Sequence, residues 1–550
     1  MKRRVLVSAL AGLSAVACVS DPAVSTGTSS SIEIINAPNL DAMDMAAGIA
    51  AGHFSAADQV AFSLGQIETL DRSGPTLQSV LSINPEAMAQ AKALDEEARN
   101  GALRGPLHGV PVLVKDNIET RELPTTAGSL ALLENKTGRD APIIARLRAS
   151  GAIIFGKTNL SEWANFRSTS SMSGWSGVGG QTKNPHSLDR SPCGSSSGSA
   201  VAVAAGLVPL AIGTETNGSI MCPSAMNGIV GIKPTVGLLS RTHIVPISPT
   251  QDTAGPMARD VKSAALMLSV MAGEDPADPA TANADDHVTD YLAGLDGDLS
   301  GLRIGVLRFA VGENEEIGAV FADGLADLEA AGATLVDIDE FEPGEAFSQS
   351  FYILQAEYKT ALNAYLADAA PAVTVRALDD LIAYNEANAA RELVLFGQEI
   401  LLMSQETGGM EEARYTEAYT ALRKASRDEG IHHLLKEYDV DVLVAPSRPP
   451  AFLIDAVYGD EYPGGTGADY IAAIAGTPNM TVPMGAVRGL PVGMSFMARA
   501  WDEATMIRAA YGFEQQSRAI VSPGFAANSF VLEETAGAMR PYVAPSEGGE

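Results

Sequence analysis

Apolar residues recur at spacings of three and four from about Leu40 onward, and this periodicity predicts amphipathic helices. Three helical segments are predicted in this part of the chain, at residues 42–49, 55–70 and 86–100. The turn-rich connector 101–109 then leads into the short apolar run 110–114, which is typical of a buried strand. Lys115 follows that run directly, so the sequence places a lysine at the end of a buried strand.

Helices and strands alternate along the rest of the chain. Further helices are predicted at 141–149 and 198–206, and further strands at 152–156, 210–213, 229–232, 440–445, 480–483 and 492–497. Residues 347–437 carry a largely helical pattern with few strand signals, which we interpret as a helical insertion. Alternating strands and helices predict a mostly parallel sheet that is covered on both faces. The expected fold is a single large α/β domain over residues 40–525 with a mixed, mostly parallel central sheet, followed by a tail at 526–550.

The composition fits a folded chain and excludes one class of partner. Hydrophobic residues make up 46% of the 550 residues and charged residues 19%, as in ordinary globular proteins. The formal net charge is −30, so there is no basic face to neutralise phosphates, and a nucleic-acid partner is excluded. We attribute the acidity to solubility. Nothing in the composition indicates a cofactor, and it leaves the oligomeric state open.

The first residues are typical of an export signal. Lys2-Arg3-Arg4 forms a charged start, and residues 5–16 form an apolar segment that is too short to span a bilayer. Ala15-Val16-Ala17-Cys18 resembles a bacterial lipoprotein cleavage site, which predicts a signal peptide over 1–18 and a lipidated Cys18 as a membrane tether; cleavage without lipidation is the alternative. Residues 19–39 are expected to form a flexible tether. The protein is therefore expected in the periplasm or anchored to a bacterial membrane, or otherwise secreted.

Cysteine usage indicates neither a disulfide framework nor a metal site. The chain has three cysteines, Cys18, Cys193 and Cys222. The last two flank serine-rich motifs, and we interpret them as two small buried side chains. No histidine or carboxylate partners stand at ligand spacing, so no metal is expected.

Two serine clusters carry the candidate chemistry. The first is the Gly/Ser segment 194–198, and the second surrounds Ser219. A flexible linker is disfavoured for the first cluster because it opens into an apolar helical run. A nucleophile elbow with Ser196 would need a buried strand before it, whereas residues 184–192 are polar and bounded by proline. The remaining interpretation joins both clusters to Lys115 in a hydrolase whose base is a lysine in place of histidine.

The arrangement of these segments resembles the amidase signature family. The family pattern G-G-S-S-G-G, then an apolar helix, then D-x-G-G-S-I-R-x-P, is present at 193–198 and 215–223, and the family's lysine segment is present at 109–117. Further matching stretches are 156–159, 231–235, 255–257, 476–479 and 489–493. The resemblance covers about residues 40–519, and several ordered motifs at family spacing are more specific than any one alone.

The resemblance implies a role for each catalytic residue. Ser219 is then the acylated nucleophile, Ser195 the bridging serine and Lys115 the base. A lysine can serve as a base only when it is neutral, and burial beside the apolar strand would lower its pKa. The oxyanion hole is expected at Thr216, Asn217 and Gly218, and Ser171 is expected in the substrate wall.

Departures from the family pattern point to one branch of the family. Asn217 and Met221 replace a Gly and an Arg, which removes an expected partner of Glu215, and Cys193 and Ser197 replace two glycines. Together with the segments 159–166 and 173–176, these variants resemble the bacterial peptide amidases. That resemblance implies hydrolysis of C-terminal peptide amides. Trp163 and Trp175 would then line a peptide groove or belong to the buried core.

Three alternative functions stay open at this point. The same residues could act on aryl acylamides, carbamates or esters. An amidotransferase A-type subunit would need partner subunits, and the export signal argues against it. A non-catalytic binding protein is disfavoured because Lys115, Ser195 and Ser219 are all present.

Overall fold

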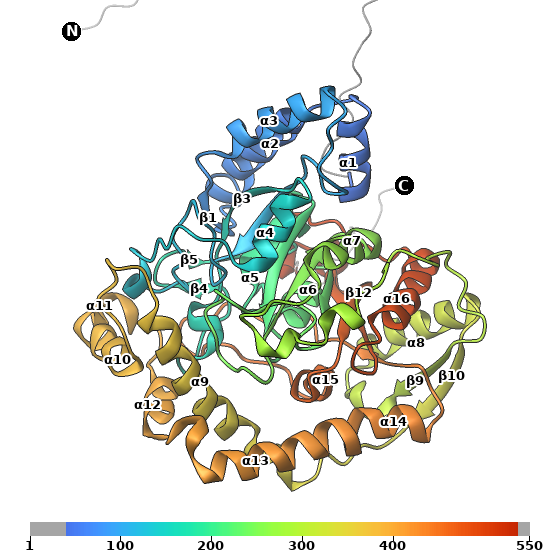
Figure 1. Ribbon diagram of the computed structural model, residues 1–550. Coiled ribbons are helices and arrows are strands. Elements are labelled where there is room, and N and C mark those ends of the chain that lie inside the picture. Colours follow the sequence, from blue (N-terminus) through green and yellow to red (C-terminus); the bar gives the residue numbers. More distant parts are fainter. Residues whose placement is uncertain (1–39, 537–538, 540–550) are drawn as a thin grey trace, which may run out of the picture. The chain divides into compact units, whose positions relative to one another are not determined.

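A central sheet of eleven strands organises the protein (Figure 1). The computed structural model describes residues 40–536 and Met539, all of which fall in the unit Pro38–Glu550. Three predicted segments lie wholly or partly outside the described residues. They are the signal peptide 1–18 with Cys18, the tether 19–39, and residues 537, 538 and 540–550 of the tail. None of the helices between residues 40 and 536 combines the length and the apolar character that a bilayer crossing requires.

The strand order across the sheet is β1-β3-β2-β6-β8-β7-β12-β13-β11-β9-β10. The strands are β1 (Val80–Ile83), β2 (Pro111–Lys115), β3 (Ile153–Thr158), β6 (Leu210–Glu215), β7 (Val230–Lys233), β8 (Thr253–Ala258), β9 (Arg303–Leu307), β10 (Thr334–Ile338), β11 (Val442–Pro446), β12 (Asn479–Val487) and β13 (Leu490–Met497). A separate two-stranded sheet is formed by β4 (Trp175–Ser176) and β5 (Gly180–Gln181).

The predicted mixed α/β sheet is confirmed, but it is less parallel than expected. Four neighbouring pairs are parallel (β3-β2, β2-β6, β11-β9 and β9-β10), and the other six are antiparallel. The difference has a local cause at the centre of the sheet. β8 carries glycine and proline in the segment 255–257, was not predicted as a strand, and runs antiparallel to both β6 and β7.

Helices cover the sheet in two groups that contact different sets of neighbours (Figure 1). The first group is α4 (Pro142–Ala149), α7 (Val261–Met271), α8 (Glu315–Ala330) and α16 (Glu503–Ser517). The second group is α5 (Ser197–Ala204) and α6 (Met221–Met226), which contact each other and the strands β2, β6, β7 and β13. Every residue of α5 and α6 is buried, which explains why their sequences are apolar or small throughout instead of amphipathic.

The N-terminal helices are α1 (Ala42–Ala50), α2 (Ala56–Gln66) with the π-helical extension η2 (Ile67–Arg72), and α3 (Ala87–Arg99). Ser55 and Asp58 form a capping box at the start of α2, which fixes where this helix begins.

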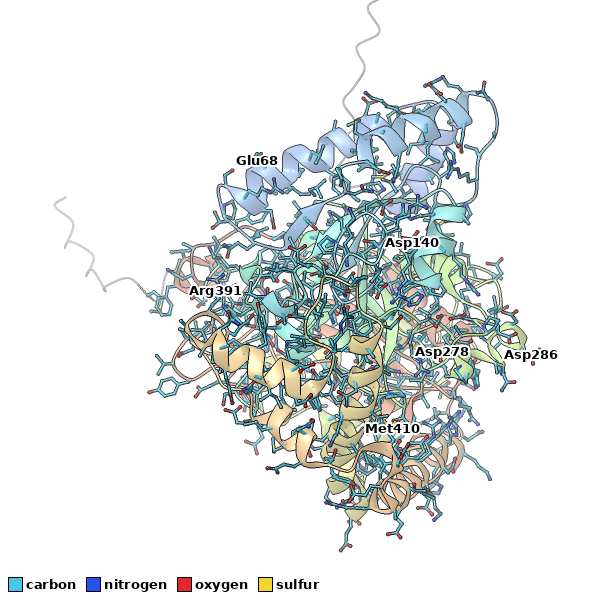
Figure 2. All side chains as sticks on the ribbon, turned by 60° about the vertical axis from the view of Figure 1, so that its left-hand side comes forward. Glu68, Asp140, Asp278, Asp286, Arg391 and Met410 are labelled. Atoms are coloured by element: carbon cyan, nitrogen blue, oxygen red, sulfur yellow. A yellow bond between two sulfur atoms is a disulfide. The ribbon has the colours of Figure 1, made fainter. Side chains whose placement is uncertain are left out.

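The chain between β10 and β11 is helical. It contains α9 (Ser350–Ala367), α10 (Leu378–Ala387), α11 (Ala389–Glu392), α12 (Glu399–Glu406), α13 (Ala413–Arg423), the π-helical stretch η10 (Lys424–Ile431) and α14 (His432–Glu437). Figure 2 labels Arg391 and Met410 in this segment and Glu68 in the N-terminal helices. Arg391 donates to the carbonyl oxygen of Gly177 (2.9 Å), so the helical segment is tied to the loop that carries β4 and β5.

Candidate active site

Lys115 ends β2 with its side chain fully buried. Its Nζ atom lies 2.8 Å from Oγ of Ser195, 2.8 Å from Oγ1 of Thr214 and 3.1 Å from the carbonyl oxygen of Thr214. The parallel pairing of β2 with β6 aligns Val114 with Ile212 and therefore brings Lys115 level with the end of β6. Because parallel strands end at the same sheet edge, the lysine and the loop after β6 meet there.

Burial lowers the pKa of Lys115 to about 7. The negative charges of Glu215 and Asp252 oppose this effect, but they do not cancel it. A neutral amine has two N–H groups and one lone pair. The two oxygens of Thr214 accept both N–H groups, which leaves the lone pair for the hydroxyl of Ser195.

The amide side chain of Asn117 holds the threonine hydroxyl that accepts from Lys115. Asn117 donates from Nδ2 to Oγ1 of Thr214 (2.9 Å), and both side chains are buried. The position of Lys115 therefore depends on Thr214 and Asn117, two residues that the sequence motifs did not single out.

The first serine cluster contains two serines with different contacts. Ser195 is fully buried, with its Oγ facing Lys115 and its carbonyl oxygen accepting from the backbone N–H of Ser161 (3.1 Å). Ser196 is the N-cap residue of α5, and its Oγ donates to the carbonyl oxygen of Thr214 (3.0 Å). The hydroxyl of Ser196 thus holds the loop to β6, and no strand runs directly into it as a nucleophile elbow would need.

Ser219 lies in the loop between β6 and α6, 8% exposed, on the wall of a cavity of about 310 Å³. Its carbonyl oxygen accepts from the backbone N–H of Ser196 (3.1 Å), so the two serine clusters are joined through the backbone. The acidic side chain of Glu215 accepts from the N–H groups of Ile220 (2.7 Å) and Met221 (3.0 Å). These two N–H groups bind the carboxylate in a site where the family pattern led us to expect an arginine.

The turn before Ser219 supplies backbone donors to the same cavity. Thr216, Asn217 and Gly218 all line it, and no acceptor for their N–H groups is found within residues 40–536. Gly218 has φ +82°, and a Cβ there would come 2.6 Å from Nη2 of Arg448, so this position requires glycine. The hydroxyl of Thr216 donates to Asp252 (2.5 Å), which fixes one end of the turn.

Three other predicted side chains lie away from this cavity. Ser171 was expected in the substrate wall; its Oγ donates to the carbonyl oxygen of Ser168 (2.9 Å), and it does not line the Ser219 cavity. Trp163 and Trp175 are buried, 2% and 8% exposed, in two hydrophobic clusters. Their core role is confirmed, and neither lines the cavity.

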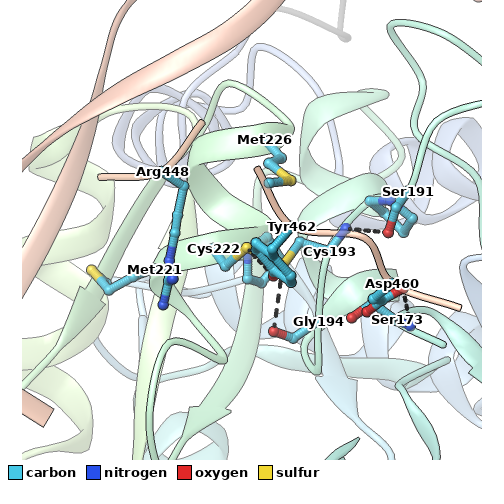
Figure 3. The surroundings of a disulfide bond; sticks show 12 residues. Ser173, Ser191, Cys193, Gly194, Met221, Cys222, Met226, Arg448, Asp460 and Tyr462 are labelled. Atoms are coloured by element: carbon cyan, nitrogen blue, oxygen red, sulfur yellow. Dashed lines mark hydrogen bonds between the residues drawn. A yellow bond between two sulfur atoms is a disulfide. The ribbon is translucent and has the colours of Figure 1, made fainter. Parts of the chain in front are cut away.

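Cys193 and Cys222 form a disulfide, which corrects the expectation of two separate buried thiols (Figure 3). The cysteines are 29 positions apart in the sequence, but α5 and β6 return the chain so that their Cα atoms lie 5.9 Å apart. Burial of both residues was predicted correctly. The closed loop contains Ser195, Thr214 and Ser219, so the crosslink spans every predicted catalytic residue except the lysine.

The cavity also contains three residues that the motif analysis missed. Arg448, Asp460 and Tyr462 follow β11 in a region without regular periodicity, so no sequence signal could place them beside Ser219. The Tyr462 hydroxyl contacts the sulfurs of both cysteines, and the Arg448 guanidinium binds Asp469 (2.6 Å). In the described part of the chain, no three His, Cys, Asp or Glu side chains gather in a way that could hold a metal ion.

Comparisons with known proteins identify the family of this chain. The sequence matches the family described as Amidase over residues 60–507. A probable amidase of Arabidopsis thaliana is 39% identical over 470 residues, which cover 84% of this chain and 87% of the relative. The X-ray structure of native peptide amidase from Stenotrophomonas maltophilia is 45% identical with a TM-score of 0.84, covering 88% of this chain and 99% of that chain.

A second solved structure contains a bound inhibitor. The peptide amidase PAM in complex with the competitive inhibitor chymostatin is 46% identical to this chain, with a TM-score of 0.85 and coverage of 88% of this chain and 99% of that chain. The chain therefore belongs to the amidase signature family and is a hydrolase of amide C–N bonds.

Proposed function

We propose that the protein hydrolyses the C-terminal carboxamide of short peptides and releases ammonia, through an acyl-enzyme on Ser219. The observation that carries this proposal is the buried contact of Lys115 Nζ with Ser195 Oγ, beside a cavity walled by Ser219. The similarity to peptide amidases over most of the chain supports the substrate class.

In the first step, Oγ of Ser219 attacks the carbonyl carbon of the amide. Its proton passes to Oγ of Ser195, while the proton of Ser195 passes to the neutral Nζ of Lys115. The carbonyl oxygen becomes negatively charged in the tetrahedral intermediate. The N–H groups of the turn 216–218, which lack acceptors of their own, can donate to this oxygen, and each such donor contributes about 3–4 kcal/mol.

In the second step, the C–N bond breaks and the same protons return. Lys115 gives its proton back through Ser195 to the nitrogen, which leaves as ammonia instead of as an amide anion. A water molecule then attacks the acyl-enzyme, with Lys115 and Ser195 again taking up the proton. The products are the peptide carboxylate, ammonia and regenerated Ser219.

Mass spectrometry tests this function directly. A short C-terminally amidated peptide is incubated with the mature protein, and the expected result is a gain of about one mass unit as amide becomes acid. The Ser219→Ala variant is the control and should leave the peptide unchanged. An unchanged peptide with the wild-type protein, in a preparation that still cleaves an aryl amide, would exclude the peptide-amide substrate and keep the catalytic residues.

A second candidate substrate class is an aryl amide or ester with a bulky leaving group. One observation favours it: a mainly apolar cavity of about 520 Å³ shares Ala164, Thr216 and Ile247 with the Ser219 cavity. Ammonia would not need this volume, whereas an aromatic amine or alcohol would. Comparing an anilide with the primary amide of the same acid measures which leaving group the protein prefers.

Export to an oxidising compartment is part of this proposal. The Cys193–Cys222 disulfide supports it, because disulfides persist in the periplasm and outside the cell and are rare in the cytosol. The charged and apolar start of the sequence supports it as well. Mass determination of the mature protein from its native host tests cleavage before Cys18 and lipidation of that residue.

A further inference from the structure

The Ser219 cavity contains a carboxylate that has no cationic partner. Both carboxylate oxygens of Asp460 lie 3.0 Å from the backbone nitrogen of Ser173, which can give them only one hydrogen (Figure 3). A carboxylate offers about four acceptor sites, and the backbone and hydroxyl of Ser173 fill only part of this capacity. No ion pair to Asp460 is present within residues 40–536.

The only cation on the cavity wall among the described residues is already neutralised. Arg448 donates from Nη2 to Oδ2 of Asp469 at 2.6 Å, and Asp469 is almost fully buried. Its guanidinium lies against Gly218 on the nucleophile turn. The charge of Arg448 is therefore balanced by Asp469, and Asp460 adds a net negative charge to the cavity.

Asp460 is fixed close to the reacting groups. Its partner Ser173 lies beside Gly194, since a Cβ on that glycine would be 3.2 Å from Oγ of Ser173. Gly194 directly precedes Ser195. On the other side, Tyr462 holds the same loop against the sulfurs of the disulfide (Figure 3). The contacts of Asp460 with Ser173 and of the nearby Tyr462 with the disulfide therefore hold the carboxylate in place before a ligand binds.

We infer that Asp460 binds the free α-ammonium group of a short substrate, so that the site selects amino-acid amides and dipeptide amides with an unblocked amino end. The inference rests on the proposed function. The leaving group of a primary amide is ammonia, so any substrate group that reaches Asp460 belongs to the acyl part. A cavity of about 310 Å³ is at the small end for ligand sites, which suits a substrate of one or two residues.

The test compares two substrates that differ at the amino end, which is a free ammonium group in one and an uncharged acetylated amide in the other. Alanyl-phenylalanine amide and its N-acetyl derivative are assayed at pH 7 with the wild-type protein, Asp460→Asn and Glu461→Gln. The wild-type protein should prefer the free amine by about tenfold or more in kcat/KM, as expected for a hydrogen bond between charged groups. Asp460→Asn should lose this preference and keep its activity on the acetylated substrate, because Asn still accepts from Ser173.

Glu461→Gln is the matched control. Glu461 is the adjacent carboxylate, is exposed and does not line the Ser219 cavity, so its removal changes the overall charge equally. It should keep the wild-type preference. An equal loss of activity of Asp460→Asn on both substrates would show that Asp460 only supports the loop, and an absent preference in the wild-type protein would also overturn the inference.

A binding measurement separates this inference from the proposed function. Calorimetry of phenylalanine amide with the Ser219→Ala variant, alone and with Asp460→Asn added, needs no turnover. Weaker binding in the double variant supports the ammonium site even if no peptide amide is hydrolysed. Equal binding in both variants contradicts it even if peptide amides are good substrates.

Discussion

The Nζ atom of Lys115 and the Oγ atom of Ser195 lie 2.8 Å apart, and neither side chain is exposed to solvent. Water therefore does not contact this pair directly, and a proton reaches the lysine through a hydrogen-bonded hydroxyl, that of Ser195 or Thr214. Thr214 accepts the two N–H groups of the neutral amine, so the geometry suits a neutral lysine whose lone pair faces the serine hydroxyl.

Activity should rise with pH through about 7. Burial lowers the pKa of Lys115 to about 7, and only the neutral form above that value can accept a proton. We expect kcat/KM for an uncharged amide to fall tenfold per pH unit below about 6 and to level off above about 8. An uncharged substrate is needed because Asp460 also titrates, with a pKa raised to about 6 by burial.

The Lys115→Met variant shows whether the lysine produces this profile. It should lose about a hundredfold or more of the activity and show no rise near pH 7. A wild-type midpoint near 10 would mean that the lysine titrates as if it were exposed, and would contradict its role as a neutral base.

Thr214→Val should lower activity roughly ten- to a hundredfold, because it removes a buried hydroxyl that accepts from both Lys115 and Asn117. The loss of an acceptor for the charged amine should also shift the midpoint of the pH profile to lower pH. Thr481→Val is the control: its hydroxyl is buried as well but binds Ser447 and has no contact with the lysine. The same pH midpoint in Thr214→Val and the wild-type protein would argue against this contact.

The disulfide should stabilise the fold by about 3–4 kcal/mol, as expected for a closed loop of this length. The Cys193→Ala/Cys222→Ala double variant should lose this amount of unfolding free energy in urea. Reduction of the wild-type protein should produce the same loss, whereas a reductant should leave the double variant unchanged. An effect of reductant on the double variant would point to a cause other than this bond.

Two buried glutamates share one arginine, and this should make stability depend on pH. Arg167 lies 2.5 Å from Glu162 and 3.6 Å from Glu392, and all three side chains are fully buried. Burial, together with the charge of Glu392, raises the pKa of Glu162 to about 8 against the attraction of Arg167. The folded protein therefore binds a proton more tightly than the unfolded chain, so this group's contribution to stability is complete below about pH 4.5 and is lost as the pH rises through about 8.

Glu162→Gln should remove this group's contribution to the decrease of the unfolding free energy with rising pH. Urea unfolding at pH 5 and pH 8 should show a smaller decrease for the variant than for the wild-type protein. Arg167→Met should cost about 3–5 kcal/mol, since it leaves the buried acidic side chains of Glu162 and Glu392 without their cation. An equal decrease of the unfolding free energy between pH 5 and pH 8 in Glu162→Gln and the wild-type protein would assign the pH dependence to other buried carboxyl groups.

The sequence allowed much of the fold to be predicted where hydrophobic runs were unbroken. The run at 110–114 and the apolar strand at 210–213 were recognised, and both are central strands of the sheet. The strands β1, β8, β9 and β10 were missed. β8 contains glycine and proline, and β10 is partly exposed, so neither has the continuous apolar pattern of a buried strand. Missing β1 and β8, which pair only with antiparallel neighbours, led to too high an estimate of the parallel pairing.

The candidate site also contains residues that the sequence could predict and residues that it could not. Lys115, Ser195 and Ser219 stand in motifs with fixed spacing, and the structure places all three at one edge of the sheet. Asp460 and Tyr462 reach the cavity from an irregular loop, and Cys193 meets Cys222 only after the chain has folded. Contacts of this kind depend on tertiary structure and leave no local pattern in the sequence.

The pairing of β2 with β6 has a consequence for refolding. Val114 stands opposite Ile212, and Lys115 reaches Thr214 only in this alignment. Since side chains alternate between the two faces of a sheet, a slip of one residue would turn the lysine to the wrong face. The activity of a refolded sample therefore measures the fraction of chains whose central strands have aligned correctly. In a refolded sample, collapsed but misaligned chains would resemble native ones in light scattering and in helical circular dichroism. They would nevertheless be inactive.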